Sequence, residues 1–137
     1  MTQISSALAI AAAGMRAQSS RMRIISENVA NASSTAQQAD GDPYRRKIPI
    51  FQSELDKATG AQLVRMNKVS ESQAEFRTVY DPGHPAANEQ GYVKYPNVNT
   101  LIELMDMREA SRSFEANLSV IENTRAMMQR TVELLNR

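Results

Sequence analysis

A heptad repeat in the last third of the chain limits what this sequence can fold into. From Thr100 to Arg137 there is no Gly or Pro. Along this segment one set of residues recurs at alternating steps of four and three, which keeps the set on one stripe of an α-helix and is typical of a coiled-coil seam. The seam consists of Thr100, Leu104, Met107, Ser111, Phe114, Leu118, Ile121, Arg125, Met128, Val132 and Leu135. Such a helix would be about 55 Å long at about 1.5 Å per residue, so it needs packing partners beyond the core of a small globule.

The start of this helix is also marked in the sequence. Pro96 disfavours helical conformation at the residue before it, and Asn97 or Asn99 can cap the helix that follows. Thr100 and Glu103 have the spacing of a capping box. We therefore predict a helical segment over residues 98–137.

A second heptad seam occupies the N-terminus, and it predicts a helix over residues 1–31. Its members are Ile4, Leu8, Ala11, Met15, Gln18, Met22, Ile25 and Val29. Gly14 is the one poor helix former inside it. The apolar run at residues 8–13 is far too short for a membrane span, and no Lys or Arg precedes Arg16, so we interpret the run as part of the helix and not as a cleaved signal peptide.

The region between the helices, residues 32–97, has the composition of a linker followed by short strands. Residues 32–44 are small, polar and turn-forming, which predicts a flexible linker. Short strands are expected at residues 46–51, where Pro49 would break the strand, and at residues 62–69, 75–80 and 91–95. The predicted fold is mainly α, with the terminal helices packed as one discontinuous coiled-coil-like domain and a small antiparallel sheet or hairpin protruding between them.

Composition excludes several functional classes. A formal net charge of +1 over 137 residues argues against a dominant nucleic-acid footprint, and the absence of Cys excludes disulfides, thiolate metal sites and cysteine nucleophiles. The single histidine, His84, has Asp81 and Glu89 as its nearest carboxylates, without metal-ligand spacing. No P-loop, serine elbow or glycine fingerprint is present. The sequence therefore predicts no catalytic, cofactor-binding or metal-binding residue.

The basic residues are unevenly distributed. All four Lys lie in the middle region, and the terminal segments carry only Arg. This bias is either chance or base composition, or it reflects the use of the planar Arg side chain where helices bury charge against neighbours.

Two motifs resemble a known family. The segment Asn28-Val29-Ala30-Asn31, which ends the first predicted helix, resembles the N-terminal motif of bacterial flagellar rod and hook proteins. A second block is similar to the more specific signature of the proximal-rod members of the flagellar basal-body rod protein family. This block comprises Tyr80, Asp81, Pro82, Gly83, His84 and Pro85, and then Gly91, Tyr92, Val93, Lys94, Tyr95, Pro96, Asn97, Val98 and Asn99. The resemblance departs from the family pattern where Thr35, Gly41 and Tyr44 are separated, and at Phe114, where an aromatic residue with a hydroxyl is common.

The resemblance implies a structural subunit that polymerises helically through its terminal helices to form the drive shaft of the flagellar rod. It implies a location in the basal body, in the rod that spans the periplasm, after export by the flagellar type III apparatus without signal-peptide cleavage. The implied partners are the protein itself, other rod proteins, the rod-base adaptor and the MS ring, with no nucleic acid and no direct membrane insertion. A cytoplasmic helical adaptor or export chaperone is the alternative.

Helix packing is the chemistry expected of such a subunit. We predict packing roles for the seam residues Leu8, Met15, Met22, Ile25, Leu104, Met107, Phe114, Leu118, Ile121 and Met128. The sequence leaves open whether they pack within one subunit or between subunits. Asn28 and Asn31 are expected to cap the first helix or to hydrogen-bond at its junction with the linker.

Overall fold

Two long antiparallel helices run side by side in the computed structural model, which describes residues 2–136. The first helix, α1, spans Thr2–Ala30, and the second, α2, spans Thr100–Leu135. Both predicted helices are therefore confirmed, as is the mainly helical fold with a small β insertion. Met1 and Arg137, the outermost residues of the two predicted helical segments, lie outside the described residues. Neither helix, over the residues described, is long and apolar enough to cross a membrane.

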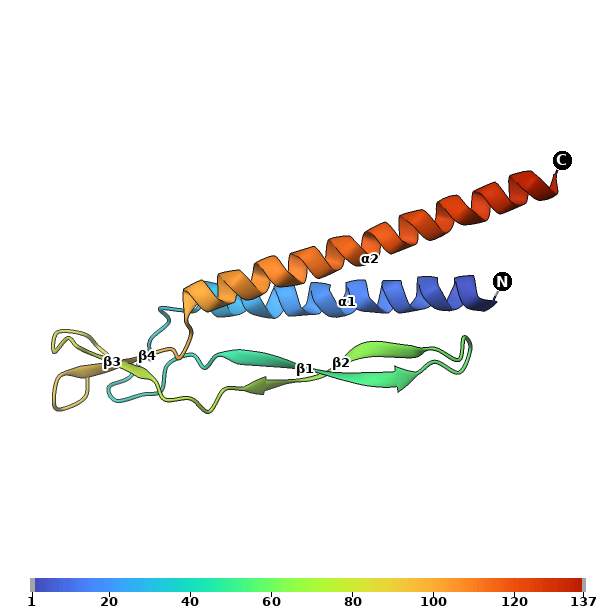
Figure 1. Cartoon of the computed structure of the whole chain (residues 1–137). Coiled ribbons are helices and arrows are strands. Elements are labelled where there is room, and N and C mark those ends of the chain that lie inside the picture. The colour runs from blue at the N-terminus through green and yellow to red at the C-terminus, as the bar shows by residue number, and fades with distance from the viewer. Residues whose placement is uncertain (1, 137) are drawn as a thin grey trace.

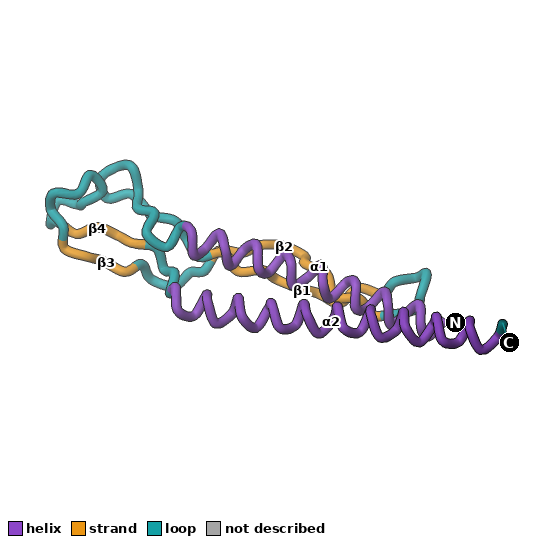
Figure 2. The backbone as a smooth tube through the Cα atoms, turned by 90° about the horizontal axis from the view of Figure 1, so that it is seen from above, coloured by secondary structure: helices purple, strands orange, loops and turns teal. Residues whose placement is uncertain are grey.

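The β insertion consists of two separate antiparallel hairpins. Strands β1 (Lys47–Leu55) and β2 (Gln62–Glu71) form the long hairpin, and β3 (Arg77–Tyr80) and β4 (Tyr92–Tyr95) form the short one. The long hairpin lies along α1, on the side away from α2, and the short hairpin lies beyond the end where α2 begins (Figure 1). Figure 2 shows the same elongated layout from above. Helix α1 is thus packed between α2 and the long hairpin, and α2 contacts none of the four strands in the part of the chain described.

The prediction that Pro49 breaks the first strand was wrong. Pro49 pairs with Val69 and β1 continues to Leu55, with an irregularity in the register between Ile50 and Phe51. In a two-stranded sheet every strand is an edge strand, so a proline can be accommodated with its missing N–H on the side away from the partner. The pattern of the sequence could not distinguish this edge position from a break.

Residues 32–44, which we predicted to be a flexible linker, are held by hydrogen bonds. The Tyr44 amide donates to the Ser34 carbonyl at 3.2 Å, and the Asp40 amide donates to the Ala86 carbonyl at 3.3 Å. Asp40 adopts a left-handed φ of 54°, and its carboxylate lies 3.3 Å from the Lys94 ammonium. These contacts fix the segment against the loop between β3 and β4.

The core is thin and built from small side chains. Most of its buried apolar residues are alanines, and the larger ones are Ile24, Ile25 and Val93. At Gly14 the two helices approach so closely that an added Cβ would lie 2.8 Å from the Asn117 side-chain nitrogen. Small residues therefore bring α1 close to its neighbours.

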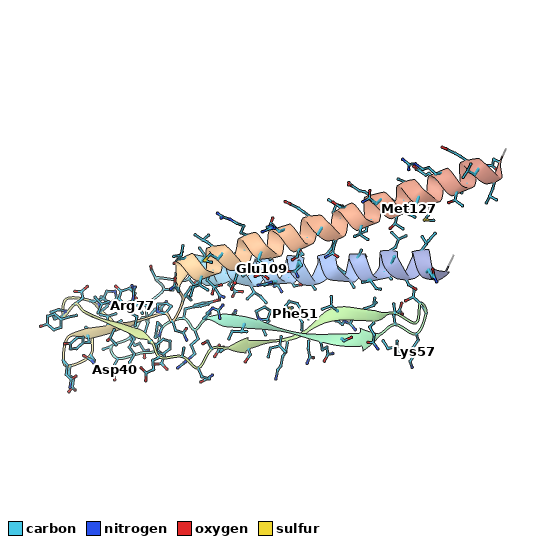
Figure 3. All side chains as sticks on the ribbon, in the orientation of Figure 1. Asp40, Phe51, Lys57, Arg77, Glu109 and Met127 are labelled. Carbon is cyan, nitrogen blue, oxygen red and sulfur yellow. The ribbon has the colours of Figure 1, made fainter. Side chains whose placement is uncertain are left out.

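Helix α2 is longer than its partner. It extends past the first turn of α1 and tilts away from it toward the C-terminus (Figure 1). In this last part of α2 the exposed apolar side chains are Val132, Leu134 and Leu135. Met127, labelled in Figure 3, is also exposed, where α2 still runs above the first turns of α1. One chain alone leaves this apolar surface uncovered.

Candidate functional site

A buried polar junction joins the end of α1, the start of β1 and the first turns of α2. At its centre, the buried Asn28 side chain uses all four of its hydrogen-bonding positions. Its oxygen accepts from the Lys47 amide at 2.9 Å and from the Tyr44 hydroxyl at 2.8 Å. Its nitrogen donates to the Lys47 carbonyl at 2.9 Å and to a Glu103 carboxylate oxygen at 3.2 Å. Asn28 thereby binds the first residue of β1 as a neighbouring strand would.

Glu103 contributes a fully buried carboxylate to the junction. One carboxylate oxygen accepts from Asn28, and the other accepts from the Arg46 guanidinium, with which it forms an ion pair. The same guanidinium lies 3.6 Å from Asp106, and Asp106 lies 3.8 Å from Arg21 of α1. A buried charge is tolerated when it is paired and hydrogen-bonded, and this arrangement satisfies Glu103 with groups from α1 and from the linker.

The residues at the start of α2 do not form the predicted capping box. Asn99 caps the helix, and its side-chain oxygen accepts from the amides of Leu101 and Ile102. Thr100 is already the first helical residue, and the Glu103 side chain points to the junction. The sequence pattern predicts a local role for Glu103, whereas its actual partners, Asn28 and Arg46, are distant in the chain.

Asn97, between β4 and α2, binds the main chain just before β1 and just after β2. Its oxygen accepts from the Arg46 amide at 2.8 Å, and its nitrogen donates to the carbonyls of Ser72 and Ala74, the latter at 3.0 Å. Asn28 and Asn97 therefore fix adjacent residues of one short segment, and they connect both helices and the end of β2 to it.

Tyr44 is a permanent donor within the junction. Burial, together with the carboxylates of Glu27, Glu103 and Glu71, raises the pKa of Tyr44 to about 12. Its hydroxyl therefore stays protonated at all physiological pH values and donates to Asn28. The sequence offered no signal for this role beyond the family motif.

The other motif residues stabilise chain turns. Asn31 donates to the Glu27 carbonyl at 2.9 Å and accepts from the Ser34 hydroxyl at 3.1 Å, which closes the end of α1. Val29 is half-buried and Ala30 is exposed.

The motif block at the short hairpin is held by close contacts. Tyr80 and Tyr92 meet edge to face with ring centroids 5.3 Å apart. Gly91 has a φ of 85°, and a Cβ there would lie 2.9 Å from the Tyr80 ring, so only glycine fits. The Asp81 amide donates to the Gly91 carbonyl at 2.9 Å. Val93 and Pro96 are buried, Val98 and His84 are half-buried, and Asp81, Pro82 and Pro85 are exposed.

The predicted packing residues divide into three groups. Ile25 is buried; Leu8, Met15, Met22, Met107, Phe114 and Ile121 are half-buried; and Leu104, Leu118 and Met128 are exposed. The stripe of α2 that the structure buries contains Glu103 and Ala110, and Asn117 lies on it beside Gly14. This stripe is rotated from the predicted seam, which leaves Leu104 and Leu118 facing solvent in the single chain.

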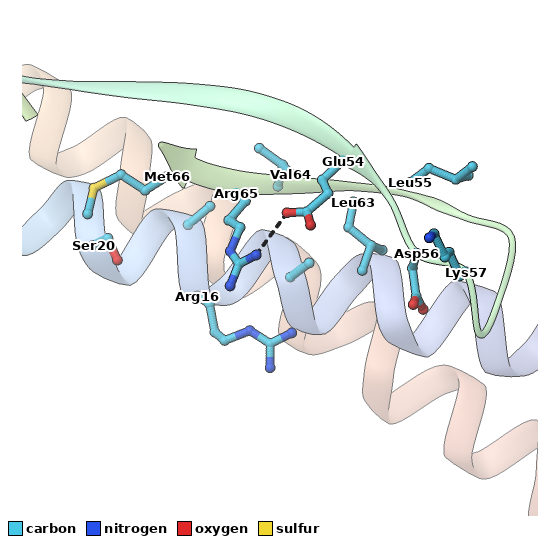
Figure 4. Close-up of a pocket in the computed structure, with 12 residues that line it drawn as sticks. Arg16, Ser20, Glu54, Leu55, Asp56, Lys57, Leu63, Val64, Arg65 and Met66 are labelled. Atoms are coloured by element: carbon cyan, nitrogen blue, oxygen red, sulfur yellow. Dashed lines mark hydrogen bonds and ion pairs between the residues drawn. The ribbon is translucent and has the colours of Figure 1, made fainter. Parts of the chain in front are cut away.

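A half-open groove of about 680 Å³ lies between α1 and the long hairpin. Ala13 and Ala17 line it from the helix, and Leu63 and Met66 line it from β2. An ion pair between Arg65 and Glu54 spans the two strands at 2.9 Å (Figure 4). No group of three or more His, Asp or Glu within residues 2–136 is placed to hold a metal ion. The arrangement of this groove, like that of the junction, is suited to packing.

Sequence comparisons agree with these features. Residues 89–134 match the family model described as flagellar basal body rod FlgEFG protein C-terminal. Over 135 residues, the chain is 50% identical to the flagellar basal-body rod protein FlgC of Agrobacterium fabrum, covering 98% of this chain and 97% of that protein. It is 40% identical to the protein of the same name from Salmonella typhimurium, over 91% of this chain and 92% of the relative. The corresponding Bacillus subtilis protein is 35% identical over 93% of this chain and 95% of the relative.

Proposed function

Because the chain belongs to the FlgC family of flagellar basal-body rod proteins, we propose that it is a proximal-rod subunit that polymerises helically through its terminal helices. In this role the helical segments 1–31 and 98–137 form the axial domain, and residues 32–97 form the middle region. The drive shaft would be built by repeating one contact between subunits. The chemistry of the protein would be packing, with no catalytic turnover.

The observation that carries this proposal is the exposed apolar surface of α2. Leu104, Leu118 and Met128 are exposed along the helix, and Val132 and Leu135 are exposed where α2 extends past α1 (Figure 1). Exposed apolar side chains gathered at one end of a helix, as between Met127 and Leu135, are typical of an interaction surface. A contact between two different faces of neighbouring copies does not close on itself, so it generates an open helical assembly.

The names of the relatives support the proposed setting. We propose a location in the flagellar basal body, in the rod across the periplasm, reached through the flagellar type III export apparatus without a cleaved signal peptide. Other rod proteins, the rod-base adaptor and the MS ring are the proposed neighbours. A cytoplasmic adaptor or export chaperone is not favoured, because relatives that match nearly the whole chain are named rod proteins.

Leu118→Asp tests whether the exposed face of α2 is covered in the assembly. Leu118 is 39% exposed in the single chain and Val69 on β2 is 41% exposed, so Val69→Asp is a matched control. A charge buried without a partner is strongly unfavourable. We expect Leu118→Asp to be made and exported but absent from purified basal bodies, with Val69→Asp still incorporated. Equal incorporation of the two variants would show that this face of α2 stays exposed in the rod.

A further inference from the structure

An exposed stripe of α1 combines small residues with two arginines. Its members recur at steps of three and four, and all are exposed: Arg16, Ser19, Arg23, Ser26 and Ala30. Arg16 and Arg23 lie one heptad apart, and neither makes an ion pair with any residue between 2 and 136. We call this set the arginine stripe. Small side chains allow another helix to approach the stripe closely. The two arginines would then favour a helix that carries carboxylates at the same spacing.

An exposed stripe of α2 has the complementary character. Its members are Leu104, Arg108, Ser111, Glu115, Leu118 and Glu122, of which only Ser111 is half-buried. Glu115 and Glu122 are also one heptad apart, and within the described chain neither carboxylate takes part in an ion pair. We call this set the glutamate stripe. Two arginines and two glutamates with the same spacing thus lie unpaired on different helices.

We propose that the arginine stripe packs against the glutamate stripe of a second copy of this chain, with Arg16 opposite Glu122 and Arg23 opposite Glu115. This inference rests on the proposed function, since it names the two faces that meet when subunits polymerise. Copies related by a helical repeat share one polarity. Because α1 and α2 are antiparallel within the chain, α1 of one copy meets α2 of the next antiparallel, as this pairing requires.

The charges also select the axial shift between copies. Within one chain, Asn28 lies beside Glu103 and Gly14 lies beside Asn117. This register places Arg16 level with Glu115 but Arg23 level with Arg108, so an unshifted neighbour would oppose one pair of like charges and leave Glu122 without an arginine. Shifting the second copy by one heptad along the helix axis, which is about 10 Å at about 1.5 Å per residue, places Arg16 opposite Glu122 and Arg23 opposite Glu115. The same shift in the opposite direction would place Arg16 opposite Arg108.

The two kinds of residue have different roles in this contact. Leu118 would be covered against Ser19 and its small neighbours, which supplies apolar burial. Exposed ion pairs contribute little to affinity, but they set register and exclude wrong partners. Arg is well suited to the positions of Arg16 and Arg23, because its planar guanidinium pairs well with carboxylates at interfaces.

Cysteine cross-linking in basal bodies tests the shifted register. The chain has no Cys, so Ser26→Cys/Ser111→Cys introduces the only thiols. With the shift of one heptad, residue 26 of one copy lies opposite residue 111 of the next, to within about one residue along the helix axis. Within one chain the two positions are about 9 Å apart along that axis, which is too far for a disulfide. We expect oxidised basal bodies to yield disulfide-linked dimers and larger species on non-reducing gels.

Ser26→Cys/Leu104→Cys is the matched variant, because it reports the unshifted register. Cross-links from this variant alone, or incorporated protein that remains monomeric in both variants, would overturn the inference. Absence of the tagged wild-type chain from basal bodies would instead overturn the proposed function, so the two failures are distinguishable.

Charge exchange tests the same contact without new thiols. Arg16→Glu/Arg23→Glu and Glu115→Arg/Glu122→Arg should each reduce incorporation by more than about tenfold, because opposed like charges are strongly unfavourable. Combining all four substitutions in one chain should restore incorporation into basal bodies. Lys57→Glu/Lys68→Glu on the hairpin makes the same change in net charge as the first variant and should be incorporated normally. A fourfold variant that is no better than either double variant would contradict the pairing.

Discussion

At the scale of single residues, the junction depends most on Asn28. One amide group satisfies the main chain of Lys47, the Tyr44 hydroxyl and part of the Glu103 carboxylate. A hydroxyl or an aliphatic side chain could not replace it, because the site needs two donors and two acceptor positions in one plane. The side chain therefore determines where β1 begins relative to α1.

Asn28→Ala should lower the free energy of unfolding by about 2–4 kcal/mol, because it leaves several buried polar groups without partners. Urea denaturation of the purified chain measures this loss. Asn67→Ala, at an exposed position of β2, is the control and should change stability by less than about 0.5 kcal/mol. Equal midpoints for the two variants would mean that Asn28 does not hold the junction together.

Tyr44 makes the stability of the junction depend on alkaline pH. Its pKa is raised from 10.0 to about 12 in the folded chain, so between these values only the unfolded state loses the proton. Stability due to Tyr44 is fully present below about pH 10 and falls as the pH rises through about 12. The difference in unfolding free energy between wild type and Tyr44→Phe should therefore shrink from pH 9 to pH 12. A difference that stays constant over this range would place the phenol outside the buried network.

At the scale of elements, the approach of α1 to α2 is set by Gly14. Replacing a helical glycine with alanine ordinarily stabilises a helix by up to about 1 kcal/mol, but here the new Cβ would overlap the Asn117 side chain. To make room, the Asn117 side chain would have to leave its 3.0 Å hydrogen bond to the Ser113 carbonyl. That loss of about 0.5–1.5 kcal/mol offsets the gain in helix propensity, so Gly14→Ala alone should add no stability. In an Asn117→Ala background the same substitution should become stabilising. Thermal melts of the four chains measure the coupling, and additive effects would contradict the close contact.

The elements themselves were predictable from the sequence to different degrees. Heptad spacing and the absence of Gly and Pro identified α2, and the same spacing identified α1. The side of α2 that faces α1 was not predictable, because the buried stripe contains Glu103 and Asn117, which a search for apolar periodicity excludes. Glu103 can be buried only because Arg46, far away in the sequence, neutralises it. The prediction that Pro49 breaks the first strand was wrong for a related reason. Whether a strand accepts a proline depends on the position of that strand in the sheet.

At the scale of the whole molecule, the chain is an elongated body with unequal ends. The end that carries the short hairpin is fixed by the polar junction, and at the other end α2 continues alone (Figure 1). The stripes that one chain leaves uncovered run along the helices and not around a pocket. Under the proposed function these stripes are the surfaces on which neighbouring subunits would pack. The chain belongs to a family of rod proteins.

Locating the protein in purified basal bodies tests most directly whether it is a subunit of the rod. A tagged copy that complements a clean deletion would be traced in purified basal bodies, and the particles would be imaged. We predict that the tag is found within the rod, and that rods, hooks and filaments are lost in the deletion strain. A tag confined to the cytoplasm, with rods still formed in the deletion strain, would contradict this prediction.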